Sequence, residues 1–328
     1  MSTAARGWAA VWGWRLLLAA VLLVFTEFLW QGAGGAARDA AAWLMLAVIY
    51  VALGAVLIDL LARFRVGDLP GVLPVAGIYG LLYGILITPQ TAFARMPISL
   101  VTRPLGLYTL GSGCLALVLL YWLVDGRGFA RWRAAALLVL GLSWGVWARR
   151  FPQLSGGSAP PLDMLLLQAL IGMIVIGVLL RLAGRGTVQD ASALRLRRWE
   201  WPFVGGVLAA AFLAGPSRGV LSTEANAALG ALLGYLIGVL YFQRGLWSRP
   251  LLSRLLPPQP VTLQTYTLYT AALVLPAALG YLLPGGGPAD VAMQALTAIF
   301  TAFGVVWLPG TSLALGLRAY VRLYRRAR

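Results

Sequence analysis

Ionisable side chains inside apolar runs are the first places to look for chemistry in this sequence. Glu27 lies in the run from Phe25 to Trp30, and no basic residue lies one helical turn away. Asp59 differs, because Arg63 follows four residues later and this spacing predicts an ion pair on one helix face. A charge at mid-membrane costs at least ~2.5 kcal/mol, so Glu27 needs either a partner or a function.

Further polar residues are predicted to lie near the depth of Glu27. Two interpretations are open. In the first, these residues line a pocket that opens outward, its arginines bind an anionic head group, and Glu27 is a pair partner or a proton carrier. In the second, Glu27 and Arg218 form a buried ion pair and the other arginines are ordinary interfacial residues. The candidate substrate-binding residues are Glu27, Arg218, Glu224, Tyr79, Tyr83, Gln90, Arg95 and Arg103.

The composition excludes several chemistries. The chain has no histidine and a single cysteine, Cys114, and all 26 of its basic residues are arginine. Zinc sites of the His and Cys kinds, Ser-His-Asp triads, lysine Schiff bases and phosphate-binding loops with a lysine are therefore excluded. An internal disulfide is excluded as well. We expect no metal and no cofactor.

The elements that must position these residues are membrane helices. Of 328 residues, 60% are apolar and 11% are charged, and the mean hydropathy is +0.83, whereas a soluble domain carries about 25% charged residues. Spans of ~20 mostly apolar residues predict an all-α, polytopic helix bundle, and no connection is long enough for a soluble domain. Residues 1–328 thus form a single integral membrane domain. The expected spans are 11–31, 41–62, 70–89, 105–124, 133–149, 162–183, 202–221, 225–243, 262–283 and 289–317.

The arginines predict the orientation. With the N-terminus inside, 20 of the 26 arginines fall on the inner side. The other six are Arg38, Arg95, Arg103, Arg149, Arg150 and Arg218. Because cytoplasmic loops carry the excess of basic residues, we expect both termini to be cytoplasmic. This placement accounts for the net charge of +16 without nucleic acid, and it offers a basic surface to anionic inner-leaflet lipids.

Both ends of the sequence leave an alternative open. Residues 1–35 resemble a secretory signal peptide, but Glu27 and Trp30 extend the apolar run to spanning length, so we expect this segment to remain as the first span. Pro309-Gly310 interrupts the last span. Residues 311–328 either continue that span with a tilt or form an interfacial helix.

Repetition and glycine spacing suggest how the helices pack. Segments 41–124 and 162–243 share local patterns in the same membrane sense, which would be a parallel repeat. Glycines recur every four residues in three spans, where a second helix can approach closely, inside this chain or in a homo-oligomer. These are Gly80 and Gly84, Gly141 and Gly145, and Gly230, Gly234 and Gly238. Pro276 lies centrally in the ninth span, where it either breaks the helix beside a cavity or produces only a structural kink.

Several positions in the first 90 residues form a pattern. It comprises Thr26-Glu27 with the aromatic residues that follow, Tyr50, Gly54, Leu57-Ile58, Arg63, Gly67, Leu73, Gly77, Tyr79-Gly80 and Tyr83-Gly84. This pattern resembles uncharacterised multi-pass inner-membrane proteins of high-GC bacteria. The resemblance implies a location in the bacterial cytoplasmic membrane and supplies no activity. Such proteins carry an acidic pair soon after the tyrosine-glycine segment. This chain has Ile85-Leu86-Ile87-Thr88-Pro89 there, so no acid–base chemistry carries over.

Three classes of function remain. A transporter or flippase-like protein for a small or lipid-linked anion fits the ten spans, the repeat and Pro276. A structural or accessory subunit, with a membrane-protein partner or a second copy, fits the glycine spacing and the sparse chemistry. A lipid-modifying enzyme would need a carboxylate pair, a histidine or a metal site, whereas the acids here are scattered singly. The sequence therefore favours transport over catalysis.

Overall fold

The computed structural model describes helices along most of the chain. The described residues are 3–30, 38–125, 130–154, 158–184, 188, 190–214, 221–244, 250–256, 259–284 and 287–327. This part of the chain has no β-strand, and Asp125 and Gln259 form an isolated bridge. The predicted all-helical class is confirmed for these residues.

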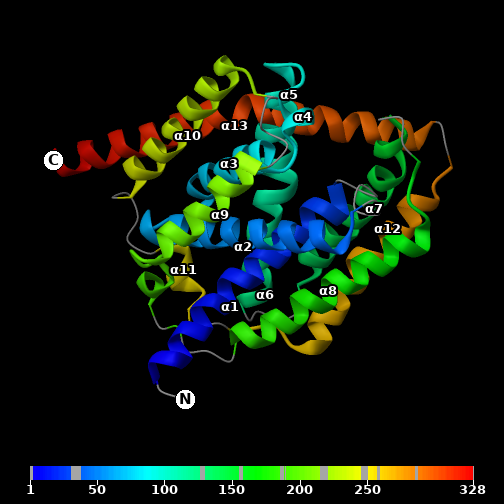
Figure 1. Ribbon diagram of the computed structural model, residues 1–328, viewed down its shortest axis with the longest axis horizontal. Coiled ribbons are helices and arrows are strands. Elements are labelled where there is room, and N and C mark those ends of the chain that lie inside the picture. The colour runs from blue at the N-terminus through cyan, green and yellow to red at the C-terminus, as the bar shows by residue number, and fades with distance from the viewer. Residues whose placement is uncertain are drawn as a thin grey trace. The chain divides into compact units, whose positions relative to one another are not determined.

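The helices follow one another with short connections (Figure 1). The first group comprises α1 (Thr3–Leu23), the π-helix η1 (Val24–Trp30), α2 (Ala40–Arg63), α3 (Leu69–Leu86), α4 (Pro89–Ala92), α5 (Ile98–Leu100), the π-helix η3 (Val101–Cys114) and α6 (Leu115–Val124). The second comprises α7 (Arg131–Leu154), α8 (Leu162–Gly184), the 3₁₀-helix η4 (Ala191–Leu194), α9 (Glu200–Ala214), α10 (Thr223–Gln243), α11 (Leu251–Arg254), α12 (Leu263–Leu282) and α13 (Pro288–Ala327).

Several helices begin where the sequence supplies a cap. Asp68 accepts a hydrogen bond from the Gly71 N–H at the start of α3, at 3.1 Å, and Pro70 occupies the first turn. Ser222 and Thr262 cap α10 and α12 in the same way. These side chains satisfy amide groups that have no partner within the first turn of a helix, so they fix where each helix starts.

Seven helical segments in the described part are long and apolar enough to cross a membrane. They are Gly7–Trp30, Ala40–Arg63, Ile98–Val124, Leu162–Gly184, Thr223–Gln243, Leu263–Leu282 and Asp290–Val321. Each corresponds to a predicted span. Two other predicted spans match shorter apolar helices, Pro70–Leu86 and Glu200–Ala214. The remaining one matches α7, which has 24 residues but carries four arginines near its ends.

Two prolines do not interrupt their helices. The helix α13 continues for 40 residues through Pro309, so of the two alternatives for residues 311–327 the structure agrees with a continuation of the last helix. The helix α12 also continues through Pro276. A proline removes one backbone hydrogen bond, and the remaining bonds hold each helix together here. A broken ninth span therefore no longer supports a cavity at mid-membrane.

The described helices fall into two compact units. The first unit consists of Met1–Val51, Val118–Val188 and Pro257–Ile299, and the second consists of Ala52–Leu117, Gln189–Leu256 and Phe300–Arg328. The unit boundaries do not coincide with the predicted repeat, 41–124 and 162–243, which stays a prediction.

In the first unit, α7 packs against α12 with their backbones almost in contact. A Cβ atom added at Gly141 would lie 2.1 Å from the Leu273 carbonyl oxygen, and one added at Gly145 would lie 2.0 Å from that of Ala277. This order of contacts makes the two helices parallel. The helix α1 runs antiparallel to α8, because Gly13 faces Ala183 and Gly172 faces Val24. The predicted close packing at Gly141 and Gly145 is confirmed.

In the second unit, α3 is the central helix. A Cβ atom at Gly80 would lie 2.3 Å from the Pro104 carbonyl oxygen of η3, and Gly84 also faces Pro104. The ring of Trp307 covers Gly77, and the Trp307 indole N–H donates to the Leu105 carbonyl at 2.9 Å. The predicted packing at Gly80 and Gly84 is therefore confirmed as well. Gly230, Gly234 and Gly238 on α10 differ, because a Cβ atom at each would meet nothing within 4 Å.

Candidate functional site

The side chain of Glu27 lies in η1 and is only 1% exposed. Its Oε2 atom is 2.5 Å from Nη1 of Arg38, and its Oε1 atom accepts a hydrogen bond from the Tyr50 hydroxyl at 2.9 Å. All three residues belong to the first unit. Both carboxylate oxygens thus have a donor, as a charge buried in a low-dielectric setting requires.

The helix that carries Glu27 changes its winding at this point. Residues 24–30 form a π-helix, and π-helical turns in proteins occur frequently at functional sites. The end of η1 is held by two tryptophans of α7. The Trp144 indole donates to the Phe28 carbonyl at 3.2 Å, and the Trp147 indole donates to the Trp30 carbonyl at 2.7 Å. Carbonyls at a helix end have no partner within the helix, and these two indoles supply one.

Arg38 connects the buried carboxylate with the surface. Its side chain is 27% exposed, whereas that of Glu27 is 1% exposed. Its guanidinium also lies over the Trp43 ring, 5.5 Å from the ring centroid. Asp39, the next residue, accepts from the Ala42 N–H at 2.7 Å and caps α2. The guanidinium therefore stands where the apolar segment begins, within reach of a solute on that side.

The arrangement can exchange one anion for another. An arginine presents several N–H donors in a plane that suits carboxylate and phosphate oxygens alike. An incoming anion could take the place of Glu27 on Arg38. Among the described residues, no three His, Cys, Asp or Glu side chains gather in one place, so no donor set for a metal ion can be named there.

The second unit contains most of the other predicted site residues. Tyr79 and Tyr83 are fully buried on α3, and their rings stack with centroids 6.0 Å apart. Tyr83 also packs edge-on against Tyr108 of η3, at 4.5 Å, and the Tyr108 hydroxyl accepts a hydrogen bond from Thr88 at 3.3 Å. These tyrosines therefore belong to the contact between α3 and η3.

The remaining predicted residues are more accessible. Gln90 and Arg95 are exposed and Arg103 is half-buried, in the segment around α4 and α5 that leads into η3. Glu224 is exposed in the first turn of α10, near the Ser222 hydroxyl. Arg218 lies outside the described residues. The partner found for Glu27 is Arg38, and the convergence of all eight residues on one pocket stays a prediction.

Sequence reasoning missed Arg38 and Tyr50 as partners of Glu27. Arg38 counted only as an outer-side arginine, and Tyr50 counted only as part of a resemblance. The signal that could have found Arg38 is its position just before an apolar run, eleven residues after Glu27. A short connection there would bring the end of one helix beside the start of the next.

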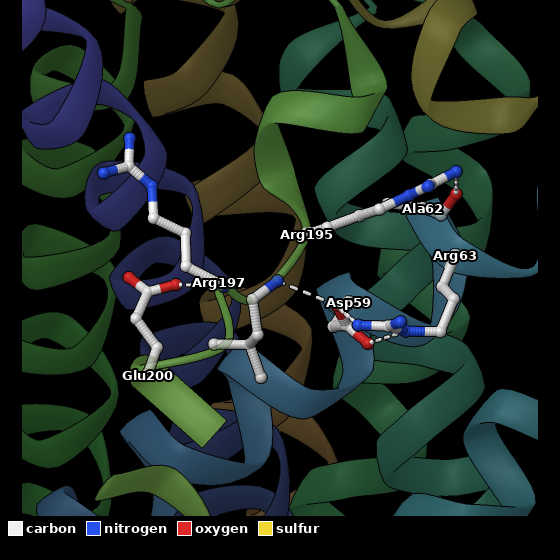
Figure 2. A network of polar contacts seen from close by, with 7 residues as sticks. Asp59, Ala62, Arg63, Arg195, Arg197 and Glu200 are labelled. Atoms are coloured by element: carbon white, nitrogen blue, oxygen red, sulfur yellow. Dashed lines mark hydrogen bonds and ion pairs between the residues drawn. The ribbon is translucent and has the colours of Figure 1, made fainter. Parts of the chain in front are cut away.

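A second polar cluster lies at the end of α2, in the second unit (Figure 2). Asp59 is fully buried and accepts from Nε and Nη2 of Arg63 at 2.8 and 2.9 Å, as its spacing predicted. It also accepts from the Leu196 N–H at 2.7 Å. Arg195 donates to the Ala62 carbonyl at 3.4 Å. This cluster fastens residues 195–196 to α2.

The start of α9 completes this cluster. The Arg197 N–H donates to the Glu200 carboxylate at 2.8 Å, and the Glu200 N–H donates to the Arg197 carbonyl at 3.0 Å. The bond from the Arg197 N–H to the Glu200 carboxylate is the half of a capping box that the glutamate supplies, and it lies where α9 begins. We interpret the cluster in Figure 2 as structural, since its carboxylates are held by the chain itself.

Comparison with known proteins assigns no family to this architecture. No protein-family model matches the chain, and searches of curated proteins and of solved structures return no match. The function must therefore be argued from the residues and contacts described above.

Proposed function

We propose that this chain is a multi-pass protein of the bacterial cytoplasmic membrane that crosses it ten times, with both termini inside. The seven long apolar helices support the membrane location. The arginine distribution supports the orientation, because 20 of the 26 arginines would face the cytoplasm.

The directions of the helices support the count of ten. In the second unit, α3 is antiparallel to η3, since Ala76 faces Gly113 and Gly80 faces Pro104. It is also antiparallel to α10, since Gly71 faces Gln243 and Gly77 faces Leu236. Two passes in the same direction must be separated by an odd number of passes. The helices between η3–α6 and α10 are α7, α8 and α9, so either one or all three of them cross. We propose that all three cross, including the 15-residue α9.

We further propose that the protein moves a small or lipid-linked anion, using Arg38 to bind the anion and Glu27 to carry a proton. The observation that carries this proposal is the pairing of a fully buried carboxylate with a partly exposed guanidinium at the end of an apolar span. Breaking a buried ion pair without replacement costs about 3–5 kcal/mol, and the solvent-accessible arginine lowers that figure here. An anion that binds Arg38 replaces the lost partner.

The test uses purified protein in vesicles with an imposed acid gradient. The probes are radiolabelled inorganic phosphate and a fluorescent short-chain phosphatidylglycerol. We expect gradient-dependent movement of one probe, its loss in Glu27→Gln and Arg38→Gln, and a smaller loss in Tyr50→Phe. Asp163→Asn is the control, because Asp163 is an exposed acid at the start of α8. Normal thermal unfolding of the variants separates a lost activity from a lost fold.

Two outcomes would contradict this proposal. Movement of neither probe by the wild-type protein would remove anion transport, and full activity of a folded Glu27→Gln protein would remove the proton role of Glu27.

A second candidate function, a subunit of a larger membrane complex, is favoured by one face of α10. Gly230, Gly234 and Gly238 form a smooth face that no other part of the described chain covers within 4 Å of an added Cβ atom. A groove of about 300 Å³ borders Gly238 and reaches Gly316 on α13. Co-purification of a fixed partner, lost in Gly234→Leu and retained in Gly205→Leu, would favour this function, because Gly205 on α9 also faces open space.

A further inference from the structure

A groove of about 390 Å³ runs between α8 and α12 in the first unit. Met173, Gly177 and Val178 line it on α8, and Tyr266 and Thr270 line it on α12. Val178 is 54% exposed, so the groove opens to the outside of the helix pair. It lies apart from the Glu27–Arg38 pair and takes no part in the proposed transport step.

The walls of the groove are apolar because their polar groups are already satisfied. The Tyr266 hydroxyl donates to the Met173 carbonyl, and the Thr270 hydroxyl donates to the Tyr266 carbonyl at 3.0 Å. The Tyr266 ring rests against Gly177, where a Cβ atom would lie 3.0 Å from it. A polar ligand would find few unsatisfied donors or acceptors along these walls, whereas a hydrocarbon chain would fit them.

One end of the groove is different, because the side chain of Arg181 lines it there. Arg181 is exposed in the last turn of α8, and none of the described residues pairs with its guanidinium. An apolar channel that ends in a cation matches a molecule with a hydrocarbon chain and an anionic head. The apolar walls suit the hydrocarbon chain, and the positive charge of Arg181 suits the anionic head.

The length of the groove agrees with the thickness of one leaflet. Its lining on α8 extends from Leu170 to Arg181. At 1.5 Å per residue this stretch covers roughly 16 Å, about half of the ~30 Å hydrocarbon core of a bilayer. A chain that enters from the head-group region at Arg181 would therefore end near the middle of the membrane.

We propose that this groove binds one acyl chain of an anionic glycerophospholipid, with the phosphate group on Arg181. The site requires that α8 crosses the membrane, but it is independent of the transport proposal. Its expected role is that of a bound lipid that holds α8 and α12 together, since the chain would fill the space between them.

The test is native mass spectrometry of the purified protein titrated with phosphatidylglycerol or with phosphatidylcholine of the same acyl chains. We expect one tight phosphatidylglycerol site. Arg181→Gln should weaken it about tenfold, the loss expected for one charge-assisted hydrogen bond. The same variant should weaken phosphatidylcholine less, because the choline cation offsets the charge of its phosphate. Arg244→Gln is the matched control, because Arg244 is likewise exposed at the end of an apolar helix.

A second pair of variants tests the acyl chain. Val178→Trp fills the groove and should weaken phosphatidylglycerol at least as much as Arg181→Gln does. Val175→Trp should have no effect, since Val175 is 44% exposed on the same helix but does not line the groove. Ile174→Trp, at a groove position that is 64% exposed, repeats the test if the first variant is unstable.

Equal affinity for the two lipids, or equal effects of Arg181→Gln and Arg244→Gln, would overturn the proposal. Competition by inorganic phosphate alone at the concentration of the lipid would show a free-anion site and would also overturn it. These measurements need no transport, so they can fail or succeed separately from the activity of Glu27.

Discussion

The side chain of Asp59 is the best test of how much one buried carboxylate contributes to this fold. It binds Arg63 through two hydrogen bonds and also accepts the Leu196 N–H, and it is 0% exposed. Asp59→Asn keeps the size of the side chain but removes the charge-assisted hydrogen bonds. Each such bond contributes at most about 1.5–3 kcal/mol to the free energy of unfolding. Because the Arg63 side chain is 40% exposed, water replaces part of this loss.

We expect Asp59→Asn to lower the thermal unfolding midpoint by roughly 2–8 °C. The measurement is the reaction of Cys114 with a thiol-reactive dye, because Cys114 is the only cysteine and is buried, so it reacts when the protein unfolds. Asp163→Asn serves as the control, since Asp163 is exposed. An unchanged midpoint in Asp59→Asn would show that the cluster in Figure 2 does not stabilise the protein.

The stability of the turn η4, which precedes α9, should depend on pH through the carboxylate of Asp190. The Ser192 hydroxyl, bonded to Oδ2 at 2.5 Å, and then the Ser192 N–H, bonded to Oδ1 at 3.0 Å, lower the pKa of Asp190. A depressed pKa means that the carboxylate adds stability above the ordinary value of about 3.9, and that this stability is lost as pH falls through the lowered value.

Amide hydrogen exchange of η4, corrected for its intrinsic pH dependence, should therefore stay constant from pH 7 to 5. It should increase only below about pH 4. In Asp190→Asn the corrected exchange should be independent of pH over the whole range, because the amide does not titrate. Faster exchange already between pH 7 and 5 would mean that another group controls this turn.

The contacts of single residues show where sequence reasoning succeeds. The bond between Asp59 and Arg63 followed from a spacing of four on one helix. The contact of Asp59 with Leu196 joins residues 137 positions apart, and only the packing of the two segments creates it. Arg38 lies between these cases, since its contact with Glu27 depends on where η1 ends and where α2 begins.

The glycines of α7 and α10 allow a matched test of helix packing. Gly145 faces the Ala277 carbonyl oxygen, 2.0 Å from an added Cβ atom, and Gly234 faces open space. Gly145→Ala must therefore push α7 and α12 apart, and overpacking of this kind costs typically 1–3 kcal/mol. Gly234→Ala should leave stability unchanged or raise it, because alanine favours the helix.

Dye reaction at Cys114 in detergent again measures the unfolding midpoint. We expect a decrease for Gly145→Ala and none for Gly234→Ala. Gly141→Ala and Gly280→Ala should resemble Gly145→Ala, since their added Cβ atoms would lie 2.1 and 2.2 Å from carbonyl oxygens of the facing helix. A larger effect at Gly234 than at Gly145 would mean that the α10 face is covered in the purified protein.

The sequence predicts that helices exist in these segments, but it does not predict which of them are π-helical. Apolar length predicts where helices lie. The structure adds the caps that fix their starts, such as Asp68 and Thr262. The π-helices η1 and η3 have no comparable pattern, because an extra residue per turn is decided by contacts. In η1 the contacts are indoles from α7, more than 110 residues later in the chain. In η3, the Thr109 hydroxyl bonds to the Pro104 carbonyl at 2.7 Å.

The number of membrane crossings depends on three helices, α3, α7 and α9, of which α9 is the shortest. Seven other helical segments in the described part of the chain have the length and apolar character to cross. The helix α9 has 15 residues, which cover about 22 Å and fall short of the ~30 Å hydrocarbon core. A short span is accommodated by local thinning of the bilayer at modest cost, so length alone does not exclude it.

Labelling of single cysteines in intact cells tests the crossing of α9. In a Cys114→Ala background, Ser192→Cys and Ser253→Cys should resist a membrane-impermeant maleimide, because both would face the cytoplasm. Thr223→Cys should react, because it would lie outside, between α9 and α10. All three positions are exposed, so burial cannot explain a missing reaction, and labelling after lysis provides the positive control.

If Thr223→Cys and Ser192→Cys behave alike, α9 does not cross, and the antiparallel packing of α3 with α10 then requires a different odd number of passes between η3 and α10. If only Ser192→Cys and Ser253→Cys react, the orientation is reversed, and the excess of arginines faces outward against the charge rule on which the ten-pass topology depends.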